Sequence, residues 1–257
     1  MPKRLSVASQ PAKFLLPALL VLALGGCQTV GIEDVTGALG GKSETSAKAE
    51  TRSDMDALRE RYRAKPGDPN LALEYGKALR ASGQHAQAVA VMEQAVLAHP
   101  NNKALLAGYG RALADNGDFQ RAFDVLSRAH SPEDPDWRIL SAQGAALDQL
   151  GRNEDAQQYY ATALKIVPDE PQVLSNLGLS YMLQNNLSKA EQVLGRAYQR
   201  NQNDARIRAN LALVLGLQGR ESEAEILVKA DLPPDQAAAK VAALRQVLAK
   251  KQQRADK

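Results

Sequence analysis

The side chains that could carry acid–base or metal chemistry are scattered along this sequence. Its three histidines, His85, His99 and His130, fall at or near expected turns and lie too far apart in the pattern to share a metal ion. The acidic pair Glu154 and Asp155 lies in an expected helix, where a solvated face explains it. There is no nucleophile motif, no phosphate-binding loop and no metal-ligand spacing. The sequence therefore predicts a protein that is not an enzyme, with no catalytic residue, no metal and no cofactor, and histidines that are solvated turn residues.

Two asparagines have the chemistry to hold another polypeptide. Asn176 and Asn210 lie 34 residues apart, and leucines accompany both. A side-chain amide both donates and accepts hydrogen bonds, so it can pair with the backbone of an extended chain. Apolar residues around the two amides would otherwise form an exposed patch, and such patches usually mark partner sites. What these residues can do depends on the elements that position them.

The same step of 34 residues runs through most of the chain. Small residues recur in four columns: Gly76, Gly110, Gly144 and Gly178; Ala88, Ala122, Ala156, Ala190 and Ala224; Ala95, Ala129, Ala163 and Ala197; and Gly83, Gly117, Gly151 and Gly219, with Asn185 in the missing place. This period predicts a solenoid of helix–turn–helix units, and the Ala- and Leu-rich composition suits an all-α protein. The expected units are 69–102, 103–136, 137–170, 171–204 and 205–232.

The small residues predict where the two helices of a unit cross. The eighth and twentieth residues of a unit, such as Gly144 and Ala156, are expected to face each other and to let the helices approach closely. A glycine in the turn accepts a positive φ at little cost, so the chain can reverse there.

The array is expected to have a cap at each end. Residues 53–64 have apolar side chains at helical spacing, with Ser53 as the expected N-cap, and form the second helix of an incomplete unit. Residues 235–250 carry one apolar stripe and would cover the last unit, because an array that ends on an apolar helix needs a solvating cap. Residues 251–257 are polar and are predicted to be a disordered tail.

This pattern resembles the tetratricopeptide-repeat (TPR) family over residues 55–232. The resemblance implies an all-α solenoid, a right-handed superhelix whose first helices line a concave groove. In that family the groove is formed by the second, fifth, sixth, ninth, twelfth and thirteenth residues of each unit. The implied groove residues here are Lys77, Arg80, Arg111, Arg138 and Asp148 in units one to three, and Asn176, Leu179, Met182, Leu183, Asn210, Leu213 and Leu217 in units four and five.

Asn176 and Asn210 fall on the position at which peptide-binding members of the family hold the backbone of the ligand. In an alternative arrangement, Leu179 and Leu213 pack between neighbouring first helices and only the asparagines face solvent. The basic residues that clamp a C-terminal carboxylate in chaperone-type members do not recur together in this sequence. The resemblance therefore does not imply a ligand with a free carboxylate.

The first residues have the order of an export signal. Lys3, Arg4 and Lys13 precede an apolar run, FLLPALLVLAL at residues 14–24, and small residues follow. The run is shorter than the about 20 residues needed to span a bilayer. Removing these three from the 32 basic residues leaves 29, equal to the 29 acidic residues. A neutral mature chain argues against a nucleic-acid binder.

The stretch LGGC at residues 24–27 resembles the lipobox of bacterial lipoproteins. The resemblance implies a signal peptide over residues 1–26 and a covalent lipid on Cys27. Gln28, in place of the usual retention aspartate, implies sorting to the outer membrane on its periplasmic side. Residues 27–52 are small and polar and are predicted to be a flexible tether. The alternative is an uncleaved anchor with an incidental cysteine.

A finer resemblance combines these features. The lipobox, the tether, about five repeats, and the stretches ANLALVLGLQGR at 209–220 and ADLPP at 230–234 are similar to the TPR lipoproteins of the Tad (tight adherence) Flp-pilus assembly system. This implies a scaffold for assembly or localisation of an outer-membrane secretin. The implied partner is a secretin or another pilus subunit, with no nucleic acid and no small-molecule substrate. Two alternatives stay open: an adaptor for peptidoglycan enzymes or outer-membrane protein assembly, and a regulator that binds a soluble signalling peptide.

Overall fold

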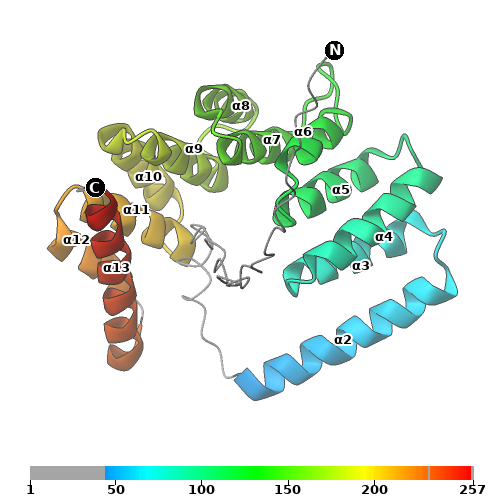
Figure 1. Cartoon of the computed structure of the whole chain (residues 1–257), viewed down its shortest axis with the longest axis horizontal. Coiled ribbons are helices and arrows are strands. Elements are labelled where there is room, and N and C mark those ends of the chain that lie inside the picture. Colours follow the sequence, from blue (N-terminus) through cyan, green and yellow to red (C-terminus); the bar gives the residue numbers. More distant parts are fainter. Residues whose placement is uncertain (1–43, 231, 256–257) are drawn as a thin grey trace, which may run out of the picture. The chain divides into compact units, whose positions relative to one another are not determined.

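The computed structural model describes residues 44–230 and 232–255, all within one compact unit. The predicted signal peptide (1–26), Cys27 and the first part of the predicted tether lie outside the described residues. Within the described residues the chain is helical apart from its turns and one isolated bridge between Ser131 and Asp134. The all-α solenoid predicted from the repeat is confirmed (Figure 1).

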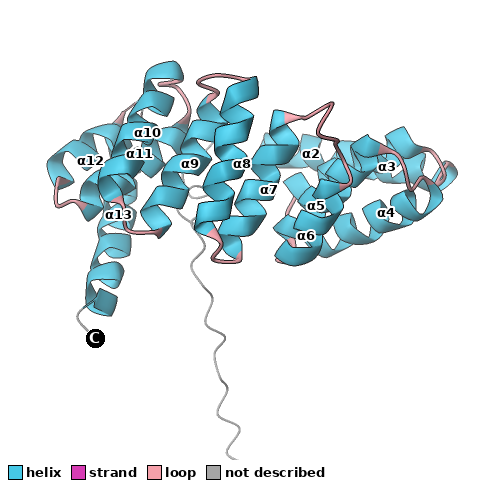
Figure 2. Ribbon diagram, turned by 90° about the horizontal axis from the view of Figure 1, so that it is seen from above, coloured by secondary structure: helices cyan, strands magenta, loops and turns pink. Residues whose placement is uncertain are grey.

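Five helix pairs follow one another along the chain (Figure 2). Each first helix begins at the first residue of an expected unit and packs against its own partner, the second helix before it and the neighbouring first helices. The pairs are α3 (Pro69–Ala81) with α4 (His85–Ala98), α5 (Lys103–Asp115) with α6 (Phe119–Ser127), α7 (Trp137–Gln149) with α8 (Asn153–Ile166), α9 (Pro171–Leu183) with α10 (Leu187–Arg200), and α11 (Ala205–Leu217) with α12 (Glu221–Lys229).

A side chain with a hydrogen-bond acceptor stands just before each first helix. These residues are Asp68, Asn102, Asp136, Glu170 and Asp204, at the same 34-residue step. Each accepts a hydrogen bond from a backbone N–H of the following helix. The first N–H groups of a helix have no partner inside it, so these caps stabilise the start of every unit.

The turn inside each pair requires a left-handed residue. The four turn glycines have φ between 74° and 87°, and Asn185 has φ 59°. Asparagine visits this region more readily than other side-chain-bearing residues. Its conformation explains why it can replace glycine in this column.

The crossing inside each of the first four pairs depends on the glycine at the eighth position, which is Gly76, Gly110, Gly144 or Gly178. A Cβ on any of these four glycines would come within 3.0 Å of a side chain of the second helix. The close approach agrees with the prediction, and at Gly110 the backbone oxygen of Ala122, the twentieth residue of that unit, lies 3.3 Å from the Cβ position. The side chain nearest to each Cβ position is that of the large twenty-fourth residue: Met92, Leu126, Tyr160 or Leu194. The glycine is the hole into which this side chain packs.

Helix α2 (Glu44–Ala64) covers the first pair. Met55 and Tyr62 are buried against it, and the rings of Tyr62 and Tyr75 lie 5.3 Å apart. The predicted start at Ser53 differs from the structure, in which the helix begins nine residues earlier. Residues 44–52, assigned to the tether, therefore belong to the helix, and their alanines are the strongest helix formers.

Helix α13 (Pro234–Ala255) covers the last pair and contacts α11 and α12. Val241 and Leu244 are buried there. The helix continues through residues 251–255, where a disordered tail was predicted, because Lys, Gln and Arg are good helix formers. Among the described helices, none has both the length and the apolar character required to cross a membrane.

Candidate functional site

A hollow of about 540 Å³ lies along the first helices of units three to five. Side chains from α7, α9 and α11 line it, including Asp148, Asn176, Leu179, Leu183 and Asn210. Five of the residues predicted for the groove are therefore brought together. The hollow is the candidate binding site on this face of the solenoid.

The two asparagines link successive first helices. Asn176 Nδ2 donates to Ser141 Oγ over 3.1 Å, and Asn210 Nδ2 donates to Ser175 Oγ over 2.9 Å. Both serines hold the fifth position of the preceding unit. Neither asparagine Oδ1 accepts a hydrogen bond within the described residues, although both side chains line the hollow. One N–H of each amide is therefore used inside the protein; the Asn176 side chain is half-buried and Asn210 is only 5% exposed.

The apolar residues predicted for the groove separate into two groups. Leu183 is 47% exposed and Leu179 is half-buried, and both line the hollow. Met182 and Leu213 are each 6% exposed and belong to the core between neighbouring helices, so their assignment to the groove is wrong. Leu217 is half-buried against the same core and is not part of the hollow. The alternative of packing between first helices fits Leu213, while Leu179 packs against the same core and also lines the hollow.

Asp148 is a fully bonded acid at one end of the hollow. Its carboxylate accepts hydrogen bonds from Ser180 Oγ at 2.7 Å, Asn153 Nδ2 at 2.8 Å and Tyr160 Oη at 2.9 Å. Burial raises the pKa of Asp148, and these three hydrogen bonds oppose the rise. Since the donors come from α8 and α9, Asp148 ties three helices together.

The basic groove residues of units one to three lie outside the hollow. Arg80 pairs with Asp115 at 2.5 Å, and the guanidinium of Arg138 lies 4.4 Å from the centre of the Trp137 ring. Arg111 makes no ion pair or hydrogen bond with the described residues. Burial lowers the pKa of Arg111, and the positive charge of Arg80 lowers it further. Lys77 is exposed.

A polar cluster that the repeat pattern did not predict joins α6 to α7. Gln143, only 1% exposed, occupies a column otherwise filled by Tyr or Leu. Its Nε2 donates to Ser127 Oγ over 2.9 Å, and its Oε1 lies 2.9 Å from His130 Nε2. The prediction that His130 is a solvated turn residue is therefore wrong. The departure of Gln143 from its column was the signal for this cluster.

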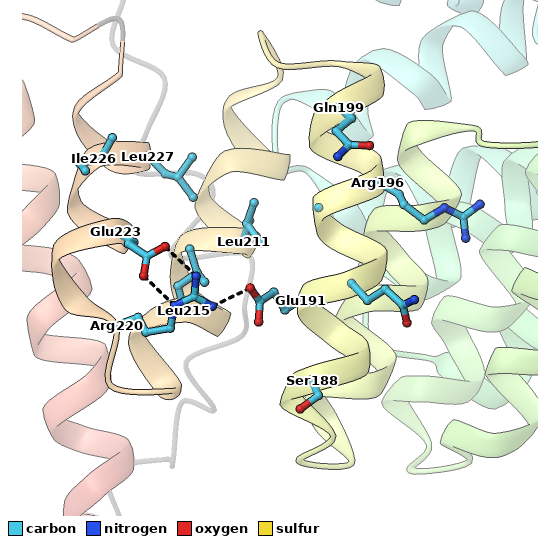
Figure 3. A pocket seen from close by; sticks show the side chains of 12 residues that line it. Ser188, Glu191, Arg196, Gln199, Leu211, Leu215, Arg220, Glu223, Ile226 and Leu227 are labelled. Carbon is cyan, nitrogen blue, oxygen red and sulfur yellow. Dashed lines mark hydrogen bonds and ion pairs between the residues drawn. The ribbon is translucent and has the colours of Figure 1, made fainter.

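A second hollow, about 730 Å³, lies between the second helices α10 and α12 (Figure 3). Leu211 and Leu215 of α11 form its floor, and Leu227 of α12 lines one wall. At one end Arg220 pairs with Glu191 and with Glu223, each at 2.6 Å. No prediction from the sequence pointed to this surface. In the described part of the chain, no group of three or more His, Cys, Asp or Glu side chains is placed to hold a metal ion.

Comparison with known proteins identifies the repeat. A family model described as Tetratricopeptide repeat matches residues 79–144, 113–179 and 146–212, which together cover more than half of the 257 residues. A comparison with curated protein sequences finds no match.

Solved structures of repeat proteins have the same fold. A tetratricopeptide repeat protein from Parabacteroides merdae aligns with TM-score 0.61 and 16% identity, over 86% of this chain and 85% of that one. TTC0263, a thermophilic TPR protein of Thermus thermophilus, aligns with TM-score 0.61 and 23% identity, over 71% of this chain and 98% of its own.

Proposed function

Because the chain belongs to the tetratricopeptide-repeat family, we propose that it is a protein-binding scaffold whose hollow on units three to five holds an extended segment of another protein. The observation that carries this proposal is the pair of acceptor oxygens on Asn176 and Asn210, one repeat apart, beside the exposed Leu183. An extended backbone has N–H groups free to donate to such acceptors, and its side chains can pack on the leucines.

The proposed location is the periplasmic side of the outer membrane. The support is the lipobox at residues 24–27 and Gln28, which lie outside the described residues. A lipid on Cys27 would hold the scaffold at the membrane, and stable anchoring requires more than one acyl chain. In a fractionation experiment, Cys27→Ser should move the protein from the membrane fraction to the soluble fraction. Full retention of this variant in the membrane would refute the lipid anchor.

The proposed partner is a secretin or another subunit of the Flp-pilus apparatus. Its support is the sequence resemblance at residues 209–220 and 230–234. An adaptor for peptidoglycan enzymes or outer-membrane protein assembly, and a regulator that binds a soluble signalling peptide, use the same hollow with other partners.

Affinity purification from the native membrane, followed by mass spectrometry, tests both the hollow and the partner. Leu183→Gln should lose the partner, because it removes apolar surface from the hollow. The matched control is Leu97→Gln, which changes a leucine that is 78% exposed and lies outside the hollow. Equal recovery of the partner by both variants would contradict the proposed site. Recovery of wall hydrolases without a secretin would contradict the pilus assignment.

A further inference from the structure

The groove between α10 and α12 is open where the equivalent gap between α4 and α6 is bridged. Between α4 and α6, Tyr109 Oη donates to Glu93 over 2.8 Å, and Arg121 donates to Tyr109 Oη over 2.7 Å. The residues of unit four and five at the Glu93 and Tyr109 positions are Gly195 and Leu211. Neither can form such a bridge, so the groove remains unfilled between its walls.

Packing within the described residues does not require a glycine at position 195. A Cβ on Gly108, Gly110 or Gly144 would clash with a neighbouring side chain, but a Cβ on Gly195 would meet nothing within 4 Å. A glycine inside a helix costs about 1 kcal/mol relative to alanine. Gly195 lines the groove, so its missing side chain widens the space available to a molecule from outside.

The walls and floor of the groove favour a helix over an extended chain. The backbone N–H and C=O groups of α10, α11 and α12 form hydrogen bonds within their own helices, and the floor of the groove consists of leucine side chains. An extended chain would bring N–H and C=O groups that find few partners there, whereas a helix satisfies its own backbone. Ile226 at the rim is 68% exposed and offers further apolar surface. The complementary ligand is therefore a helix with an apolar stripe.

One end of the groove carries an excess of negative charge. Near the start of α10, Glu191 and Glu223 share Arg220, which leaves one negative charge in excess. Near the end of α10, the side chain of Arg196 points away from α12 and pairs with Asp169 of the turn before α9 (Figure 3). A helix with basic residues in its last turn is complementary to this acidic end when it runs antiparallel to α10.

We propose that the groove between α10 and α12 binds an amphipathic helix of another protein, antiparallel to α10, with a large apolar side chain over Gly195. This site is separate from the hollow on the first helices and does not depend on the proposed function. The helix contributes an apolar stripe to Leu211, Leu215 and Leu227, with its basic last turn beside Glu191 and Glu223.

A designed peptide tests this site directly. The probe is a fluorescein-labelled helical peptide of about 18 residues, five turns, with a leucine stripe, glutamates in its first turn and lysines in its last. Fluorescence anisotropy should show binding to the full chain. Gly195→Gln, which fills the space with a side chain, should weaken binding about tenfold or more. Ala161→Gln, which places a glutamine at the equivalent, exposed position of α8 one repeat earlier, should leave the affinity unchanged.

Control peptides and further variants distinguish the proposed site from other binding modes. A peptide with glutamine in place of the leucines should not bind, and exchanging the end charges should weaken binding. Failure of the original peptide to bind, or equal affinities of the Gly195→Gln and Ala161→Gln variants, would overturn the proposal. Loss of binding on Leu183→Gln would place the peptide in the other hollow and also overturn it. If Gly195→Gln instead dissociates a dimer in sedimentation velocity, the occupant is a second copy and the proposed partner helix is wrong.

Discussion

The N-terminal and C-terminal repeats have the same register but use their side chains differently. In units one and two, Glu93, Tyr109 and Arg121 form a bridge between helices, and Arg80 pairs with Asp115. In units four and five, Gly195 and Leu211 at the Glu93 and Tyr109 positions leave an open groove, and Oδ1 of each asparagine accepts no hydrogen bond from the described residues. The comparison suggests that the first repeats stabilise the array internally while the last repeats are available for partners.

Within the C-terminal repeats, neighbouring residues should differ most in stability. Met182→Ala should lower the free energy of unfolding by about 2–5 kcal/mol, because Met182 is buried in the core. Leu183→Ala should change it by less than about 0.5 kcal/mol, since Leu183 is at the surface of the hollow. Urea unfolding followed by circular dichroism measures both. Similar losses would mean that the hollow is part of the core.

Substitutions at two helical glycines, Gly144 and Gly195, should have opposite effects on stability. Gly144→Leu should destabilise the protein by about 1–3 kcal/mol, because its Cβ would lie within 3.0 Å of Tyr160. Gly195→Leu has open space and should raise stability by up to about 1 kcal/mol through helix propensity. Thermal melting of the two variants checks this contrast. A destabilising Gly195→Leu would show that the groove is already filled.

The bridge formed by Glu93, Tyr109 and Arg121 should contribute measurably to the free energy of unfolding. Tyr109→Phe removes the hydroxyl that joins Glu93 and Arg121, and should cost about 0.5–1.5 kcal/mol. Tyr159→Phe is the control, because its ring packs against Phe123 while its hydroxyl has no hydrogen bond to the described residues. Equal unfolding free energies for the two variants would mean that the Tyr109 hydroxyl does not stabilise the N-terminal repeats.

The smallest effect is a shift in titration. Burial, with the hydrogen bond to Glu93, raises the pKa of Tyr109 to about 12 from its ordinary value of 10.0. The fold therefore favours the protonated phenol, and the contribution of this phenol is complete below pH 10.0 and is lost as pH rises towards 12. Difference absorbance between the wild type and Tyr109→Phe should show an ionisation near pH 12. An ionisation at pH 10.0 would mean that the bridge is not formed in solution.

The positions of the helices follow closely from the sequence because local chemistry recurs at one step. Turn residues with positive φ, such as Gly83 and Asn185, end every first helix, and capping residues such as Asp68 start it. Both effects act over a few residues, so the period alone is enough to locate them.

The composition of the site follows less well because it depends on how neighbouring helices pack. Met182 and Leu183 are adjacent and equally apolar, yet one is buried and the other exposed. Ser141 and Ser175 bond to asparagines 35 residues away, a contact that no single repeat displays. The groove beside Gly195 is likewise open because no side chains bridge the helices there, which only the three-dimensional arrangement of the helices reveals.

Site-specific photocrosslinking in native cells tests the central claim most directly. A benzophenone side chain at position 183 lies in the hollow, and one at position 97 lies at an exposed position of α4 outside it. Position 183 should give a crosslink to one envelope protein, through an extended segment of that protein, and position 97 should give none. Crosslinks of equal yield to the same protein from both positions, or none from position 183, would contradict this claim.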